Sequence, residues 1–91
     1  MERNKDVIID MLKMLRDYDG PEMTIDLNSI AVRYKMKTLA EATYHYQLAV
    51  SAGFIISKGQ VGENQHDFDR QSSSLGWAGY EYLESLEPGG I

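Results

Sequence analysis

The first apolar residues of the chain recur at helical spacing. Between residues 4 and 18 they are Val7, Ile8, Met11, Leu12, Leu15 and Tyr18. Intervals of three and four residues place such side chains on one face of an α-helix. Asn4 is a suitable N-cap, and Gly20-Pro21 would end the helix because glycine permits a left-handed exit and proline cannot continue. We therefore expect an amphipathic helix over residues 4–18.

A short strand and a short second helix are expected next. Residues 22–26, EMTID, are too few for a helix and match a short edge strand. Residues 27–34, LNSIAVRY, place their apolar side chains on one helical face, and Asp26 or Asn28 can cap this helix. The polar segment 35–38, KMKT, predicts a tight break before the next helix.

A third helix is expected over residues 39–52, and its faces differ in character. Thr38 and Glu41 have the spacing of a capping box at its start. The face predicted to be buried carries Ala42, His45, Leu48, Ala49 and Ala52. The opposite face is polar and almost uncharged, with Ala40, Thr43, Tyr44, Gln47 and Ser51. A third, apolar strip, predicted to lie away from the core, consists of Leu39, Tyr46 and Val50.

Strand and turn signals follow the third helix. Gly53 supplies a residue for its left-handed end. The elements expected after it are a strand at 54–58, a hairpin loop at 59–71, a return strand at 72–75, a helix at 76–86 and a frayed tail at 86–91. A helix-turn-helix followed at once by a β-hairpin is the winged-helix arrangement. The chain, 1–91, is therefore predicted to be one α+β domain: a three-helix core, a β-hairpin wing and a C-terminal helix.

Two segments also resemble known winged-helix proteins. YHYQLAVSAGFI at 44–55 resembles the H-L-x-x-L-x-x-A-G-L-I stretch of winged-helix repressors of the metal-sensing and antibiotic-resistance types. LGWAGYEYL at 75–83 resembles the segment that leaves their wing, although Gly76 stands where they carry threonine. The whole chain resembles a domain of unknown function found in small uncharacterised bacterial and phage proteins. The matching positions are Met1, Arg3, Asp6, Val7, Tyr44, His45, Leu48, Ala52, Gly53, Phe54, Ile55, Leu75, Trp77, Gly79, Tyr82 and Leu83. The resemblance implies a winged-helix fold and no established activity.

Composition narrows the class of protein. The absence of cysteine among the 91 residues excludes a disulfide scaffold and a thiolate metal site, and it suits a reducing cytosol. No apolar run approaches the roughly 20 residues of a membrane span, and the N-terminal MERNKDVIID does not have the pattern of a secretory signal. We expect a cytoplasmic protein with no membrane partner. Without a P-loop, a dinucleotide fingerprint or a nucleophile–base pair, we expect neither an enzyme nor a cofactor.

Charge is distributed unevenly along the chain. The net charge of −5 argues against a non-specific nucleic-acid coat. Residues 28–61 nonetheless hold four basic residues against Glu41 alone, a net charge of +3. Lys35 and Lys37 lie in the break before the third helix, and Arg33 lies just before the break, where a helix-turn-helix meets DNA phosphates. The residues expected to contact phosphate are Arg33, Lys35, Lys37, Thr38 and Lys58. The alternative interpretation is ordinary solvated surface charge.

Thr43, Tyr44 and Gln47 would face base edges if the third helix enters a DNA groove. No arginine lies on this arc, so the commonest guanine contact is missing. The hairpin loop carries acidic residues, Asp67 and Asp69 among them, which a DNA backbone would repel.

Other polar and aromatic residues are assigned structural roles. His45 is expected to be a hydrogen-bonded core histidine rather than a ligand. His66, beside Asp67, has no second histidine or cysteine at ligand spacing, so no metal site is expected. The aromatic residues near the C-terminus are expected to pack in the core or an interface: Trp77, Tyr80 and Tyr82.

The sequence thus predicts a DNA-binding regulatory winged-helix protein, of the kind carried by phages and mobile elements, that acts as a homodimer. The alternative is an interaction module in which the same fold binds protein and no DNA. The acidic hairpin and C-terminal helix favour the alternative, as does the apolar strip that contains Tyr46.

Overall fold

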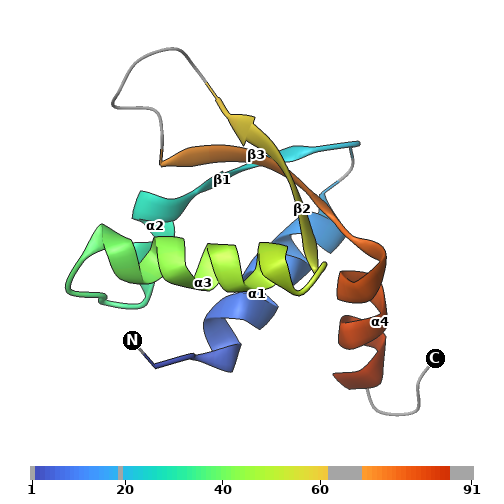
Figure 1. The fold of residues 1–91 in the computed structure, drawn as a ribbon, viewed down its shortest axis with the longest axis horizontal. Helices are drawn as coiled ribbons and strands as arrows, with labels where there is room; N and C mark the ends of the chain where they lie inside the picture. The colour runs from blue at the N-terminus through green and yellow to red at the C-terminus, as the bar shows by residue number, and fades with distance from the viewer. Residues whose placement is uncertain (1, 19, 62–68, 87–91) are drawn as a thin grey trace.

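The computed structural model describes residues 2–18, 20–61 and 69–86, which form four helices and a three-stranded antiparallel sheet (Figure 1). In chain order the elements are α1 (Lys5–Asp17), β1 (Met23–Asp26), α2 (Leu27–Arg33), α3 (Leu39–Ser51), β2 (Ile55–Gln60), β3 (Arg70–Leu75) and α4 (Trp77–Leu86). The predicted α+β class is confirmed. Residues 62–68 of the predicted hairpin loop and residues 87–91 of the predicted tail lie outside the described residues.

Side chains before α1 and α2 determine where these helices begin. Asn4 Oδ1 accepts a hydrogen bond from the Asp6 N–H at 3.0 Å, as predicted for an N-cap. Asp26 Oδ1 accepts from the Asn28 N–H at 3.0 Å, so Asp26 rather than Asn28 caps α2. At α3 the capping-box prediction is wrong. Thr38 is the N-cap residue, but its side chain accepts no hydrogen bond from the helix. The Glu41 N–H donates instead to the backbone carbonyl of Thr38 at 3.3 Å.

Gly53 ends α3 in the left-handed conformation predicted for it, with φ +79°. Its N–H donates to the Val50 carbonyl at 3.0 Å, and the Phe54 N–H donates to the Ala49 carbonyl at 2.9 Å. This pair of bonds closes a Schellman motif, which satisfies carbonyls at the end of the helix. The chain can therefore pass directly from α3 into β2 (Figure 1).

The sheet has the strand order β1-β3-β2, so β1 is an edge strand, as predicted, and β2 is the other edge. Ser57 pairs with Ser73, but Gly59 pairs with Ser72, and the register shift leaves Lys58 as a β-bulge. The sequence pattern placed Gly59 in the hairpin loop, but a bulge can hold a glycine inside a strand. Strands β2 and β3 consequently extend two residues further toward the loop than predicted.

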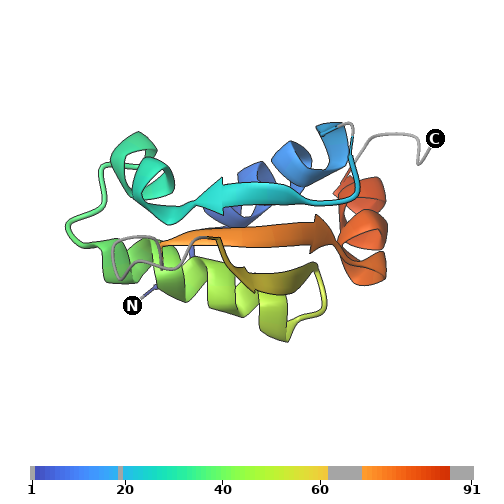
Figure 2. The same cartoon turned by 90° about the horizontal axis from the view of Figure 1, so that it is seen from above.

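The core lies between the sheet and the helices α1 and α3, which sit on the same side of the sheet (Figure 1, Figure 2). Its buried apolar residues are Val7, Ile8, Met11, Leu12, Leu15, Ile25, Leu27, Ile30, Ala31, Ala42, Tyr46, Ala49, Ile55 and Leu83. Tyr18, which its spacing assigned to the apolar face of the first helix, is instead the C-cap residue of α1 and is half exposed.

The buried face of α3 is rotated toward the sheet relative to the prediction. Tyr46, predicted to lie away from the core, is only 5% exposed, and its hydroxyl lies 2.6 Å from Ser73 Oγ. Leu48 is half-buried and Ala52 is exposed, although both were predicted to be buried. A buried tyrosine needs a partner for its hydroxyl, and β3 supplies one that the spacing of apolar residues does not reveal.

Helix α4 lies at one end of the long axis of the molecule, and the turn between α2 and α3 lies at the other (Figure 1, Figure 2). Gly76 and Gly79 allow α4 to approach the α3–β2 turn closely. A Cβ atom at either glycine would overlap a carbonyl oxygen of that turn, which belongs to Gly53 or Phe54. The close approach explains why position 76 is glycine rather than threonine.

Candidate nucleic-acid interface

A tight turn over residues 34–38 joins α2 to α3 and carries two of the predicted cations. The Lys35 N–H donates to the Val32 carbonyl at 3.2 Å, and the Met36 N–H donates to the Ala31 carbonyl at 2.9 Å. The bonding pattern is the same as at the end of α3. Here, however, the left-handed position is held by Lys35, with φ +53°, instead of a glycine. A side chain in this conformation costs roughly 1–2 kcal/mol.

The exposed side chains of this turn lie beside the start of α3. The Lys35 and Lys37 side chains make no hydrogen bond or ion pair with another described residue, and Thr38 is also exposed. The first backbone N–H groups of α3 follow at once, together with the positive end of its helix dipole. The structure thus brings three predicted site residues together at a helix end that attracts anions.

Arg33, at the end of α2, is already paired. Its Nη1 donates to Asp10 Oδ2 of α1 at 2.6 Å, and the hydrogen bond and charge of Asp10 raise the pKa of Arg33. The Tyr34 hydroxyl lies 3.1 Å from the same carboxylate oxygen. The Arg33 side chain is 56% accessible, so its other N–H groups can still reach a phosphate. Because Asp10 balances its charge, Arg33 brings less net positive charge than the sequence predicts.

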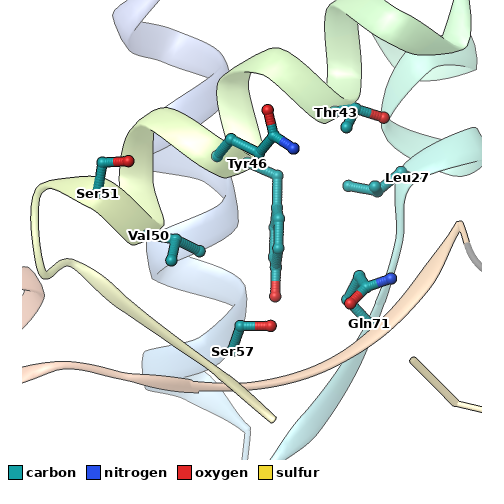
Figure 3. Close-up of a pocket in the computed structure, with 8 residues that line it drawn as sticks. Leu27, Thr43, Tyr46, Val50, Ser51, Ser57 and Gln71 are labelled. Carbon is teal, nitrogen blue, oxygen red and sulfur yellow. The ribbon is translucent and has the colours of Figure 1, made fainter. Parts of the chain in front are cut away.

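An open groove of about 480 Å³ separates α3 from the strands β2 and β3 (Figure 3). Its lining residues are Leu27, Thr43, Tyr46, Gln47, Val50, Ser51, Ser57 and Gln71. None of these described lining residues is acidic or basic. Figure 3 shows the Tyr46 side chain extending from α3 toward the strands, with Ser57 and Gln71 on the sheet side.

Two of the three predicted base-reading residues line this groove. Gln47 is exposed, and its side chain makes no hydrogen bond with another described residue. Thr43 Oγ1 donates to the Leu39 carbonyl at 3.1 Å, so its methyl group and lone pairs remain for other contacts. Tyr44 is half-buried outside the groove, and its ring meets His45 edge-on with centroids 5.4 Å apart. The structure therefore joins Thr43 with Gln47 and separates both from Tyr44.

Sequence reasoning did not identify the sheet side of the groove. Ser57 and Gln71 belong to strands that meet α3 only after folding. The available signal was the apolar strip on the third helix, because Tyr46 and Val50 from that strip do line the groove. Lys58, the predicted cation of the hairpin, is exposed in the β-bulge, and its side chain makes no hydrogen bond or ion pair with another described residue.

His45 is a core histidine, as predicted. It is 3% exposed, its Nε2 accepts from the Asn4 N–H at 2.9 Å, and its Nδ1 lies 2.7 Å from the Glu41 carbonyl. The neutral tautomer with hydrogen on Nδ1 satisfies both contacts. His66 and Asp67, which were considered for a metal site, lie outside the described residues.

The aromatic residues of α4 divide into two groups. Tyr82 stacks on Phe54 with ring centroids 4.8 Å apart, as expected for a packed side chain. Trp77 is 79% exposed, with its indole N–H donated to Glu81 at 2.7 Å, and Tyr80 is 46% exposed. Helix α4 therefore presents aromatic rings and carboxylates on its outer side.

No protein-family model matches the chain, and no curated protein or solved structure matches it. None of the described helices is long and apolar enough to cross a membrane. Two structural features point to a function: the left-handed backbone conformation of Lys35 and the groove beside α3, whose described lining residues carry no charge.

Proposed function

We propose that this chain is a winged-helix protein that binds duplex DNA through α3 and regulates transcription. The order of elements supports the proposal, with α2 and α3 as a helix-turn-helix and β2 and β3 as the wing. The observation that carries it is Lys35, which holds a left-handed backbone position that glycine would hold at lower cost. Backbone strain of this kind is concentrated at functional sites.

In the proposed complex, one DNA phosphate lies at the start of α3. Lys35 and Lys37 supply the cations there, and the first N–H groups of α3 supply hydrogen-bond donors. Lys58 contacts a second stretch of backbone from the wing. Arg33 adds a weaker contact because Asp10 already accepts one of its N–H groups.

The acidic net charge limits the affinity without preventing contact. Glu81 and Glu84 of α4 lie at the other end of a molecule 43 Å long from the Lys35 turn (Figure 1). Because the Debye length is about 8 Å at physiological salt, these carboxylates are largely screened from a phosphate bound at that turn. With two or three phosphates neutralised, log K against log salt should have a slope of only about −2 to −3 per chain.

The test is a titration of random-sequence duplex at about 50 mM and 200 mM salt. We expect measurable binding at the lower concentration and the shallow slope given above. Lys35→Ala with Lys37→Ala should weaken binding to all sequences alike and flatten the slope by about 0.9 for each phosphate that is no longer neutralised. Lys13→Ala, which removes an exposed cation from α1, is the matched control. Absence of binding near 50 mM salt would falsify the proposal.

The second candidate function is binding to a protein partner. The observation that favours it is the outer side of α4, where Trp77 is 79% exposed next to Tyr80 and Glu81. Exposed aromatic rings of this kind are enriched where proteins associate. If Trp77→Ser leaves the DNA titration unchanged and Lys35→Ala alters it, DNA binding belongs to the turn and not to α4, and α4 stays available for a protein partner.

A further inference from the structure

Three residues that line the groove occupy one stripe of α3. Thr43, Gln47 and Val50 are spaced four and three residues apart, which makes them neighbours on the helix surface. Together they present a methyl group, a primary amide and a branched apolar side chain. Because base pairs in the major groove differ in donors, acceptors and methyl groups, this stripe can discriminate among them.

The amide of Gln47 complements adenine. Adenine presents an N7 acceptor and an N6 donor in the major groove, so one amide can donate to the first and accept from the second. Guanine presents two acceptors, N7 and O6, and the amide oxygen of Gln47 would face one of them. Gln47 is exposed, and its side chain makes no hydrogen bond with another described residue, so its amide can turn toward a base.

The other two side chains complement thymine. Thr43 donates its hydroxyl hydrogen to the Leu39 carbonyl at 3.1 Å, so it cannot also donate to a guanine acceptor while that bond holds. Its methyl group and the half-buried Val50 offer an apolar surface suited to the C5-methyl of thymine. The methyl of thymine and the N6 and N7 groups of its partner adenine lie in the same groove.

Among the described residues, the charges that would favour a G·C pair are missing from the lining. Guanine is most often read by arginine or lysine, and cytosine N4 by a carboxylate. None of the eight described residues that line the groove is basic or acidic. We infer that α3 reads an A·T base pair, with Gln47 on adenine and with Thr43 and Val50 on the thymine methyl. The inference rests on the proposed DNA-binding function and assigns its sequence preference.

The experiment selects bound duplexes from a random library at about 50 mM salt and then alters single atoms of the selected site. We expect enrichment of A·T at one or more fixed positions. Replacing the critical adenine with 7-deazaadenine removes N7, and replacing the thymine with uracil removes the methyl group. The adenine change should lower affinity by at least about fivefold, as expected when a bidentate base contact is broken, and the thymine change by a smaller factor.

Variants assign each effect to a side chain. Gln47→Ala should lose its sensitivity to 7-deazaadenine and keep its sensitivity to uracil. Thr43→Ser keeps the hydroxyl and removes the methyl, so it should keep its sensitivity to 7-deazaadenine and lose part of its sensitivity to uracil, because Val50 still contacts the thymine methyl. Lys13→Ala changes an exposed residue of α1, outside the groove, and should keep both sensitivities.

The possible outcomes distinguish a wrong base assignment from a wrong DNA-binding function. Binding without A·T enrichment, enrichment of G·C, or indifference of wild-type protein to 7-deazaadenine overturns the base assignment and leaves DNA binding intact. Failure to bind any duplex overturns the proposed function and the base assignment with it.

Discussion

The Tyr46 hydroxyl lies 2.6 Å from Ser73 Oγ and joins α3 to the central strand of the sheet. Ser73 Oγ in turn lies 3.1 Å from the Gln71 carbonyl and donates to it. Tyr46 is therefore the donor and Ser73 the acceptor in the first bond. Ser73 is fully buried, so neither hydroxyl can exchange this partner for bulk water.

Removing one partner of the Tyr46–Ser73 hydrogen bond should lower the free energy of unfolding more than removing both partners. Ser73→Ala leaves the Tyr46 hydroxyl buried without its acceptor, which should lower the free energy of unfolding by about 1–3 kcal/mol. Adding Tyr46→Phe removes the unpaired hydroxyl, so the double variant should recover part of that loss of stability. Urea denaturation of wild type, both single variants and the double variant measures the coupling. Strict additivity of the two changes would show that the bond contributes nothing.

Replacing Lys35 with glycine should stabilise the fold while weakening DNA binding. Glycine relieves the backbone strain of the left-handed position, which is roughly 1–2 kcal/mol. Glycine also raises the conformational entropy of the unfolded chain, which lowers stability by about 0.4–1 kcal/mol. The net gain in unfolding free energy should be about 0.5–1 kcal/mol, measured by denaturant titration. Lys37→Gly removes the same charge at a residue without positive φ and should destabilise instead. A loss of stability in Lys35→Gly would contradict the strain argument.

Gly53→Val should lower the melting temperature. A β-branched side chain at φ +79° is strained, at a cost of about 1 kcal/mol or more. Thermal unfolding followed by circular dichroism measures the change. Gly53→Asn is the control, because asparagine tolerates the left-handed region better and should lose less. Equal melting temperatures for wild type and Gly53→Val would rule out the proposed role of the turn.

Alkaline pH should remove a contribution to stability that depends on Tyr34. Burial, and then its hydrogen bond to Asp10, raise the pKa of Tyr34 above the ordinary 10.0. The folded state thus holds the phenolic proton more tightly than the unfolded state. The resulting stability is fully present below pH 10 and is lost as pH rises through the raised pKa.

Urea titrations at a series of pH values up to about 11 should show this loss. The stability advantage of wild type over Tyr34→Phe should shrink above pH 10, the ordinary pKa of the phenol. Asp10→Asn removes the neighbouring charge and should reduce the pH-dependent part. An advantage that stays constant across the series would argue against the Tyr34–Asp10 contact.

Light scattering at high concentration should give about twice the chain mass of 10.3 kDa, since we expect a homodimer. The physical reason is the exposure of Trp77 and Tyr80 on α4, where association would remove aromatic surface from water. Trp77→Ser with Tyr80→Ser should return the mass to that of one chain. A wild-type mass of 10.3 kDa throughout the concentration range would exclude the dimer.

The elements of the fold could be predicted because their signals are local. Helical spacing, the Asn4 cap and the Gly53 exit all act within a few residues, so the expected elements appear with small changes at their ends. The bulge at Lys58 could not be predicted in this way. It depends on how β2 registers against β3, and a glycine near a hairpin also suits a turn.

The candidate site was predictable only in part, because two of its features depend on distant residues. Asp10 lies 23 positions before Arg33, and Ser73 lies 27 positions after Tyr46. The Arg33–Asp10 contact balances a cation that has no partner nearby in the sequence. The Tyr46–Ser73 contact places in the core a tyrosine that its position on the third helix predicted to lie outside the core.

The irregular edge of β2 also protects the folded molecule from intermolecular strand addition. A neighbouring chain that extends the sheet needs a regular row of backbone donors and acceptors, and the bulge interrupts that row at a lysine. The opposite edge, β1, offers only four residues and ends at the charged Asp26. We therefore expect copies that meet at high concentration to associate through helices rather than by adding strands to the sheet.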